Sequence, residues 1–166
     1  MEIPAFYQRY MSLVENDQLT NSCIIEGDQA LAFYKSIPEQ LSDYRYAEGK
    51  WSIKEILAHV IDTERVFSYR ILRFGRGDQT ELPGFDENFY AERMNIENRK
   101  FYQLINEFAN LRASTVDLLS SLSAEQKLNN GTASGVSFNV TQLIKVLIGH
   151  EIHHRNVIEE RYLKNE

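Results

Sequence analysis

The sequence contains few of the residues that cross-link a fold or interrupt its helices. Its 166 residues include one cysteine, three prolines and eight glycines. A single thiol, Cys23, cannot form an intramolecular disulfide, so the fold has to be held by packing rather than by covalent links. These numbers exclude a disulfide-rich scaffold, and we expect Cys23 to be a buried structural thiol with no catalytic partner.

Basic clusters and long apolar runs are also missing. Lys and Arg number 18 against 24 Asp and Glu, giving a formal net charge of −6, and no basic block can neutralise a run of phosphates. No apolar stretch approaches the ~20 residues that cross a bilayer, and no basic start precedes an apolar run at the N-terminus. We therefore expect a cytoplasmic protein that binds neither nucleic acid nor membrane.

Helical periodicity dominates what remains. Hydrophobic residues make up 43 % of the chain, which is enough for a continuous core, and we expect one domain over residues 1–166. Four long segments repeat apolar residues at helical spacing, whereas alternation bounded by hairpin turns is not found. The sequence therefore predicts an all-α fold, a four-helix bundle with a short N-terminal helical segment and long inter-helix loops.

The first bundle helix is expected at residues 21–36, after a short helical segment at residues 6–14. Its predicted core residues are Ile24, Leu31 and Tyr34.

The second helix has the best-marked start in the chain. The Ser52 hydroxyl can cap the helix while Glu55 reaches back to the cap, which is the reciprocal arrangement of a capping box. The apolar residues that follow recur at intervals of three and four until the run ends near Gly75. The members of this predicted buried stripe are Ile53, Ile56, Leu57, Val60, Phe67 and Ile71.

The third helix is expected from about residue 89 or 92 to residue 122, and the last from near Asn139 to Tyr162. The polar connections GRGDQTELPGFDEN and NNGTASGVS are expected to be loops. Loops of this length leave room for an up-down-down-up path or for plain antiparallel neighbours, and they often line sites.

Three of the four histidines lie in the segment GHEIHHRNV of the last helix. His150 and His154 are four residues apart, so their imidazoles leave the same helix face one turn apart and can bind one ion together. Both continue the apolar stripe of that helix, where imidazoles without partners are costly to bury. A metal ion would satisfy their lone pairs directly. His153 points elsewhere, towards the surface or behind the ligands.

His59 lies at the edge of the apolar face of the second helix. It can complete a set of three nitrogen ligands, or it can be a hydrogen-bonded core histidine. Three protein ligands leave coordination positions open for water or substrate, as in catalytic metal sites. Imidazole suits zinc, nickel, iron and copper alike, so the ligand type does not identify the ion.

Several other polar residues fall near these histidines. Glu64 lies inside the apolar stripe and can be a fourth ligand, a catalytic general base, or a carboxylate paired with an arginine such as Arg155. Asp62 and Glu151 can orient imidazoles from behind or be solvated helix charges, and the second is the commoner role. Trp51 is expected to be a packing residue ahead of the helix cap.

A family resemblance is carried by four segments: GKWSIKEILAHVIDTERVFSYRILRFGRGD, LPGFDENFY, GTASG and GHEIHHRNVIEERYL. Together they resemble the DinB-like superfamily of metalloenzymes over essentially the whole chain. The resemblance implies a four-helix bundle, commonly dimeric, with a divalent metal ion bound by one histidine of the second helix and two of the last. Those positions are His59, His150 and His154, so the resemblance favours His154 over His153.

The resemblance also implies a range of reactions. Characterised relatives include transferases that join low-molecular-weight thiols to electrophiles, isomerases that depend on such thiols, and proteins assigned as hydrolases. We therefore expect a homodimeric, metal-dependent enzyme that activates a thiol or water and acts on a small molecule, as an S-transferase or a hydrolase. Zinc or nickel is the expected ion, with manganese or iron as alternatives. The rival hypothesis is a non-catalytic protein in which the metal stabilises a dimer or holds a ligand.

Overall fold

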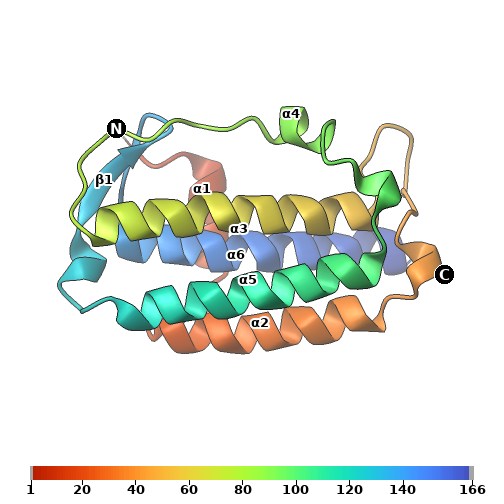
Figure 1. The fold of residues 1–166 in the computed structure, drawn as a ribbon, viewed down its shortest axis with the longest axis horizontal. Coiled ribbons are helices and arrows are strands. Elements are labelled where there is room, and N and C mark those ends of the chain that lie inside the picture. The colour runs from red at the N-terminus through yellow and green to blue at the C-terminus, as the bar shows by residue number, and fades with distance from the viewer. Residues whose placement is uncertain (1, 165–166) are drawn as a thin grey trace.

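Four long helices form the body of the computed structural model, which describes residues 2–164 (Figure 1). Their bounds are Leu19–Ser36 for α2, Ile53–Gly75 for α3, Phe101–Ser121 for α5 and Val140–Ile158 for α6. A short helix, α1 at Ala5–Ser12, precedes them, so the predicted all-α bundle with an N-terminal helical segment is confirmed. Within the described residues, no helix is long and apolar enough to span a membrane.

Short helical turns connect these elements. They are the 3₁₀ turns η1 at Glu39–Leu41, η2 at Ile96–Asn98 and η3 at Gln126–Leu128, the helix α4 at Glu87–Ala91, and the π-helical turn η4 at Glu159–Leu163. The last of these continues α6 towards the C-terminus (Figure 1).

The four helices follow an up-down-down-up path. In Figure 1, α2 and α6 run in one direction and α3 and α5 run in the other. α3 packs against α5 and α6, and α2 packs against the same two helices, so α2 and α3 occupy opposite corners of the bundle. This is one of the two paths that the long loops left open.

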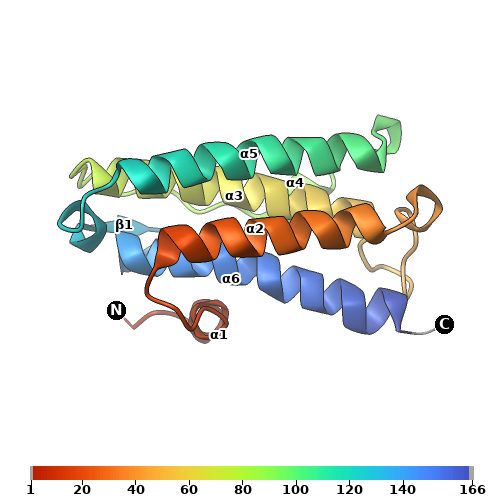
Figure 2. The ribbon, with the colours of Figure 1, turned by 90° about the horizontal axis from the view of Figure 1, so that it is seen from below.

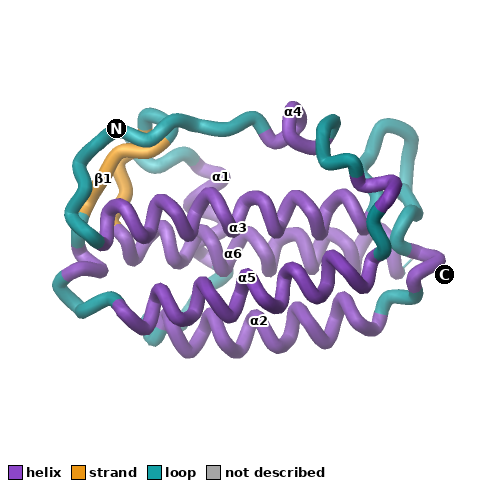
Figure 3. Tube along the Cα trace, viewed as in Figure 1, coloured by secondary structure: helices purple, strands orange, loops and turns teal. Residues whose placement is uncertain are grey.

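The parallel arrangement of α3 and α5 explains the long connection between them. α3 has 23 residues and is therefore ~34 Å long, and the chain has to return along that length before α5 begins. Residues 76–100 make this return along the α3 side of the bundle, with α4 and η2 within it (Figure 3). The prediction of one continuous helix from about residue 89 is wrong, because α4 ends at Ala91 and Asn95 adopts a left-handed φ of 49°.

α3 follows its prediction closely. The Ser52 hydroxyl accepts a hydrogen bond from the Glu55 N–H at 3.2 Å, and the Glu55 carboxylate accepts one from the Ser52 N–H at 2.6 Å. This reciprocal pair is the predicted capping box, and every residue of the predicted stripe is buried. The start of α3 and its rotation about its axis are thereby both set by local sequence.

α2 departs from its prediction at one residue. Tyr34 is fully buried and Leu31 is partly buried, but Ile24 is 42 % exposed. The buried face of α2 instead passes through Cys23, which is fully buried, and through the small residue Gly27. Ile24 therefore lies about 100° round the helix from that face.

Residues 130–139 form a β-hairpin where a loop was expected. β1 spans Asn130–Ala133 and pairs antiparallel with β2 at Val136–Asn139. Ser134 and Gly135 have φ values of 54° and 72°, and positive φ at both central residues is what a two-residue hairpin turn of type I′ requires. The prediction failed because each strand has only four residues, too few to establish an alternating pattern.

The hairpin also fixes the returning segment. The Leu82 N–H donates to the Thr132 carbonyl at 2.9 Å, and the Ser134 N–H donates to the Leu82 carbonyl at 3.0 Å. Gly131 allows the hairpin to lie flat on α3, because a Cβ there would come within 2.3 Å of the Phe74 ring. These contacts hold the returning segment to the hairpin and the hairpin to the C-terminal end of α3.

α1 lies outside the four-helix bundle, against α6 (Figure 2). The close approach depends on Gly149 of α6, where a Cβ would lie 1.9 Å from the Tyr10 carbonyl oxygen. As a result, the centre of the Tyr10 ring lies 5.4 Å from the centre of the His150 ring and 5.3 Å from that of the His153 ring. α1 therefore covers the histidine-rich part of α6.

Replacing Gly149 with alanine tests this packing. Inside a helix, Gly→Ala ordinarily raises stability by roughly 0.5–1 kcal/mol. In this protein we expect the opposite sign, because the new methyl group would overlap a backbone carbonyl of α1. Urea unfolding should show a lower free energy of unfolding, and trypsin should cleave faster after Arg9. A more stable variant would contradict the close contact.

Candidate metal centre

The packing of α3 against α6 brings three histidines together. His59 projects from α3, while His150 and His154 project from successive turns of α6. The Nε2 atom of His150 lies 3.0 Å from Nε2 of His59 and 3.1 Å from Nε2 of His154. The potential ligand atoms of all three lie within 4.8 Å of one another. This is a cluster of a kind that can hold a divalent metal ion.

Burial keeps these imidazoles uncharged. His59 and His150 are buried, and burial lowers the pKa of His59 to about 4. The pKa of His150 lies well below its ordinary value through burial and the neighbouring histidines, and the pKa of His154 is lowered for the same reasons. Neutral imidazoles offer a lone pair to a metal ion, so the electrostatics of the cluster suit ligation.

A cavity of about 420 Å³ opens onto the three histidines. It lies between α3, α6, α1 and the returning segment that follows α3. Most of its walls are aromatic, and the rings that line it are Phe6, Tyr7, Tyr10, Trp51, Phe67 and Phe85. The cluster is therefore reached through a mainly apolar chamber, as in small-molecule sites.

Sequence reasoning missed most of these walls. Trp51 was expected to be a packing residue only, yet it lines the cavity with its ring 4.9 Å from that of His59. The α1 residues Phe6, Tyr7 and Tyr10 carried no site prediction. The signal that could have found them is the density of aromatic residues in so short a helix, AFYQRYMS, which has no buried residue of its own.

The remaining candidates around the histidines do not belong to the three-histidine cluster. His153 is half-buried and packs beside Tyr10, and burial lowers its pKa. Asp62 interacts with Arg65 at 3.3 Å. Glu151 is fully buried, so its interpretation as a solvated helix charge is wrong; burial raises its pKa to about 7. Neither carboxylate forms a hydrogen bond to a histidine among residues 2–164.

Glu64 forms a buried ion pair with an arginine that was not anticipated. The Arg112 side chain of α5 donates from Nε to Oε1 at 2.9 Å and from a terminal nitrogen to Oε2 at 2.8 Å. The expected kind of partner is therefore present, but it is Arg112 rather than Arg155, which instead pairs with Glu26. Glu64 does not line the cavity, and both of its oxygens are engaged.

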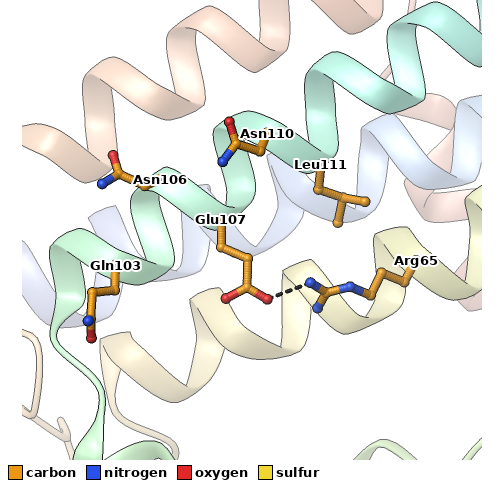
Figure 4. A pocket seen from close by; sticks show the side chains of 6 residues that line it. All are labelled: Arg65, Gln103, Asn106, Glu107, Asn110 and Leu111. Carbon is orange, nitrogen blue, oxygen red and sulfur yellow. Dashed lines mark hydrogen bonds and ion pairs between the residues drawn. The ribbon is translucent and has the colours of Figure 1, made fainter.

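A second hollow lies on the face formed by α3 and α5 (Figure 4). Its volume, about 520 Å³, exceeds that of the histidine cavity. Polar and charged residues line it, apart from Leu111, and in Figure 4 Arg65 and Glu107 point towards one another and form an ion pair of 2.5 Å. No histidine is among the described residues that line it. We regard it as a solvated groove between two helices rather than a reactive site.

Removing the charge of Glu64 should destabilise the fold strongly. Glu64→Gln leaves the buried Arg112 guanidinium without its counter-charge, and loss of one partner from a buried pair typically costs about 3–5 kcal/mol. The matched control is Glu107→Gln, whose arginine partners are more exposed, and it should cost about 1 kcal/mol or less. Urea unfolding of both variants measures the difference. If Glu64→Gln lowered the free energy of unfolding no more than Glu107→Gln, the buried ion pair would not be required for stability.

Stability should also fall in acid through the histidine cluster. An unfolded histidine has a pKa near 6.5, whereas folded His59 has a pKa of about 4, so between these values the unfolded state binds more protons and stability is lost as pH falls. For His59 the loss from pH 7 to pH 5 is about 2 kcal/mol. Urea unfolding of chelator-treated protein should show a smaller loss for His59→Gln than for wild type. The same loss in both would contradict a neutral, buried His59.

Comparison with known proteins agrees with this geometry. Residues 26–158 match the family model of the DinB superfamily. Among solved structures, the chain is similar to YfiT from Bacillus subtilis, described as a probable metal-dependent hydrolase with an unusual four-helix bundle topology. The TM-score is 0.68 at 16 % identity, over 96 % of this chain and 87 % of that one, which establishes a shared fold. Comparison with curated proteins finds no match. Because the family model covers most of the sequence, the chain belongs to the DinB superfamily.

Proposed function

We propose that this protein is a metal-dependent enzyme that binds one divalent cation through His59, His150 and His154 and acts on a small molecule in the adjoining cavity. The observation that carries the proposal is the convergence of three Nε2 atoms, from two helices, at the wall of one cavity. A structural role alone would not need the cluster to face a chamber of this size.

The donor set itself narrows the class of ion. All three donors are imidazole nitrogens, and no carboxylate joins the cluster among the described residues. Magnesium and calcium prefer oxygen ligands, whereas neutral imidazole suits zinc, nickel and similar ions. We therefore propose zinc or nickel, with manganese or iron as less favoured occupants.

Three protein ligands would leave coordination positions free, and a cation held in this way acts as a Lewis acid that lowers the pKa of a bound thiol or water. The protein supplies the rest of the site. His59 ties α3 to α6 through the cluster, and the rings of Tyr10 and Trp51 flank it and limit the access of water. This arrangement suits thiol transfer or hydrolysis equally well, and we propose this pair of reaction types.

Glu64 has no place among the reacting groups in this proposal. Its two oxygens are held by Arg112, and it is absent from the cavity wall. The rival hypothesis of a non-catalytic protein would gain support from histidines hydrogen-bonded to Glu64, and the pairing of Glu64 with Arg112 removes that support.

Metal content tests the ligand set directly. Purified protein is stripped with chelator, reloaded with zinc, nickel or manganese, dialysed and measured by elemental analysis. We expect about one ion per chain in wild type and in His153→Ala, and almost none in His59→Ala, His150→Ala or His154→Ala. His153 is the matched control because it neighbours the ligands but lies outside the cluster.

Two outcomes would overturn the assignment. Full metal content in any of the three ligand variants would remove that residue from the set. Loss of metal in His153→Ala with retention in His154→Ala would exchange their roles. If wild type binds metal, a screen of thiol transfer and of ester or amide hydrolysis, with His150→Ala as the blank, tests the reaction.

A further inference from the structure

The cavity face of α3 continues beyond the metal cluster. Thr63, Phe67 and Arg70 follow His59 at intervals of four, four and three, so these side chains lie on one face of the helix. Thr63 and Phe67 line the cavity, and the Thr63 hydroxyl is buried with no hydrogen-bond partner among the described residues. The α3 wall of the cavity therefore carries one hydroxyl, that of Thr63, for which the described residues offer no hydrogen-bond partner.

Arg70 is a second polar side chain on this face of α3; it does not itself line the cavity but lies behind residues that do. Only 1 % of it is exposed, yet no carboxylate pairs with it within residues 2–164. One terminal nitrogen donates to two neutral acceptors, the Pro83 carbonyl at 3.0 Å and the Ser134 hydroxyl at 2.9 Å, and the Tyr7 hydroxyl also interacts with the guanidinium. For the other terminal nitrogen, the described residues offer no acceptor within hydrogen-bond distance. A buried guanidinium without a counter-charge is costly, and an anion would satisfy it.

The guanidinium lies beside the cavity. Long helical side chains lean towards the N-terminus of their helix, which for Arg70 is the direction of His59. Accordingly, its central carbon lies 5.1 Å from the centre of the Phe67 ring, which lines the cavity. Ser134 lines the cavity as well, and it is exposed on the hairpin turn. A ligand oxygen can therefore replace the Ser134 hydroxyl as acceptor and also engage the unpartnered nitrogen.

We propose that the cavity takes an elongated small molecule with a carboxylate, and that Arg70 binds this carboxylate at the hairpin end while the reacting group lies at the three histidines. The position of the reacting end rests on the proposed function; the anion site does not. Along the axis of α3, His59 and Phe67 are ~12 Å apart, which sets the length of the molecule. The Thr63 hydroxyl lies between the two ends and can bond to a polar group in the middle.

The surrounding charges are compatible with an anion. Among the described residues that line the cavity, Glu87 carries the one carboxylate, and it is exposed, so solvent screens it. A guanidinium binds a carboxylate through two parallel, charge-assisted hydrogen bonds, which gives both strength and orientation. If Arg70 only held the hairpin to α3, the protein would bind a carboxylate and its neutral analogue with the same affinity.

The proposal is tested by measuring whether the protein binds a carboxylate more tightly than the matching neutral amide. The probes are 4-phenylbutanoate and 4-phenylbutanamide, which share a ring that suits the aromatic walls and differ in charge. Their affinities are measured by calorimetry at fixed ionic strength, with chelator-treated protein so that no metal ion can bind the carboxylate. We expect the acid to bind wild type at least about tenfold more tightly than the amide.

The variants locate the source of the preference. Arg70→Gln should remove the difference, mainly because it weakens binding of the acid. Arg70→Lys, which keeps a charge and protects the measurement if the glutamine variant does not fold, should keep a reduced preference. The matched control is Arg73→Gln, since Arg73 lies one turn further along α3 and pairs with Asp78 instead. It should behave as wild type.

Each remaining outcome is decisive. Equal binding of acid and amide to wild type, or a preference that survives in Arg70→Gln, would overturn the anion site. A preference that appears only after zinc loading and disappears in His150→Ala would place the carboxylate on the metal, which overturns this proposal and supports the metal site. If wild-type protein cannot be loaded with metal at all but still binds the acid more tightly than the amide, the anion site is supported and the proposed function is contradicted.

Discussion

The contact between α3 and α6 is the one on which the site depends. Neither helix carries the whole histidine cluster, because His59 comes from the first and His150 and His154 come from the second. A shift of one residue in either helix would turn its side chains by about 100° and separate the nitrogens. The capping box at Ser52 fixes where α3 begins, and the buried stripe fixes which of its faces meets α6.

Two buried arginines of the bundle, Arg112 and Arg70, differ in how their positive charge is compensated. Arg112 is neutralised by Glu64 between α5 and α3, where the pair joins two helices away from the cavity. Arg70 is buried to a similar extent, but within residues 2–164 its hydrogen-bond acceptors are neutral, and it lies beside the cavity. A closed pair of the first kind contributes to the fold, whereas an open cation of the second kind is a place where a ligand can bind.

Local sequence could predict the features that depend on near neighbours. The capping box, the stripe of α3 and the i, i+4 histidine pair are all set within a few residues, and the resemblance to the DinB-like superfamily added His59 to that pair. The features that were missed have two kinds of cause. Arg112 meets Glu64 only after α5 packs, which near neighbours in the sequence do not indicate. The left-handed Asn95 and the four-residue strands are local, but too short to interrupt or establish a periodic pattern.

Dependence on distant partners also explains why the cavity walls were missed. The aromatic residues of α1 indicate that this helix packs against something, but they do not indicate that Tyr10 covers α6, since that contact depends on the absence of a side chain at Gly149. The homodimer, the thiol partner, the single domain over residues 1–166 and the identity of the ion stay predictions, since none of them follows from the packing of one chain.

A crystal of the zinc-loaded protein, measured at wavelengths on either side of the zinc absorption edge, tests the central claim most directly. If the three histidines hold the ion, the anomalous map will contain one strong peak per chain, at ~2.0–2.1 Å from Nε2 of His59, His150 and His154. A peak ligated by His153 or by carboxylates, or no ordered zinc at the cluster, would contradict it.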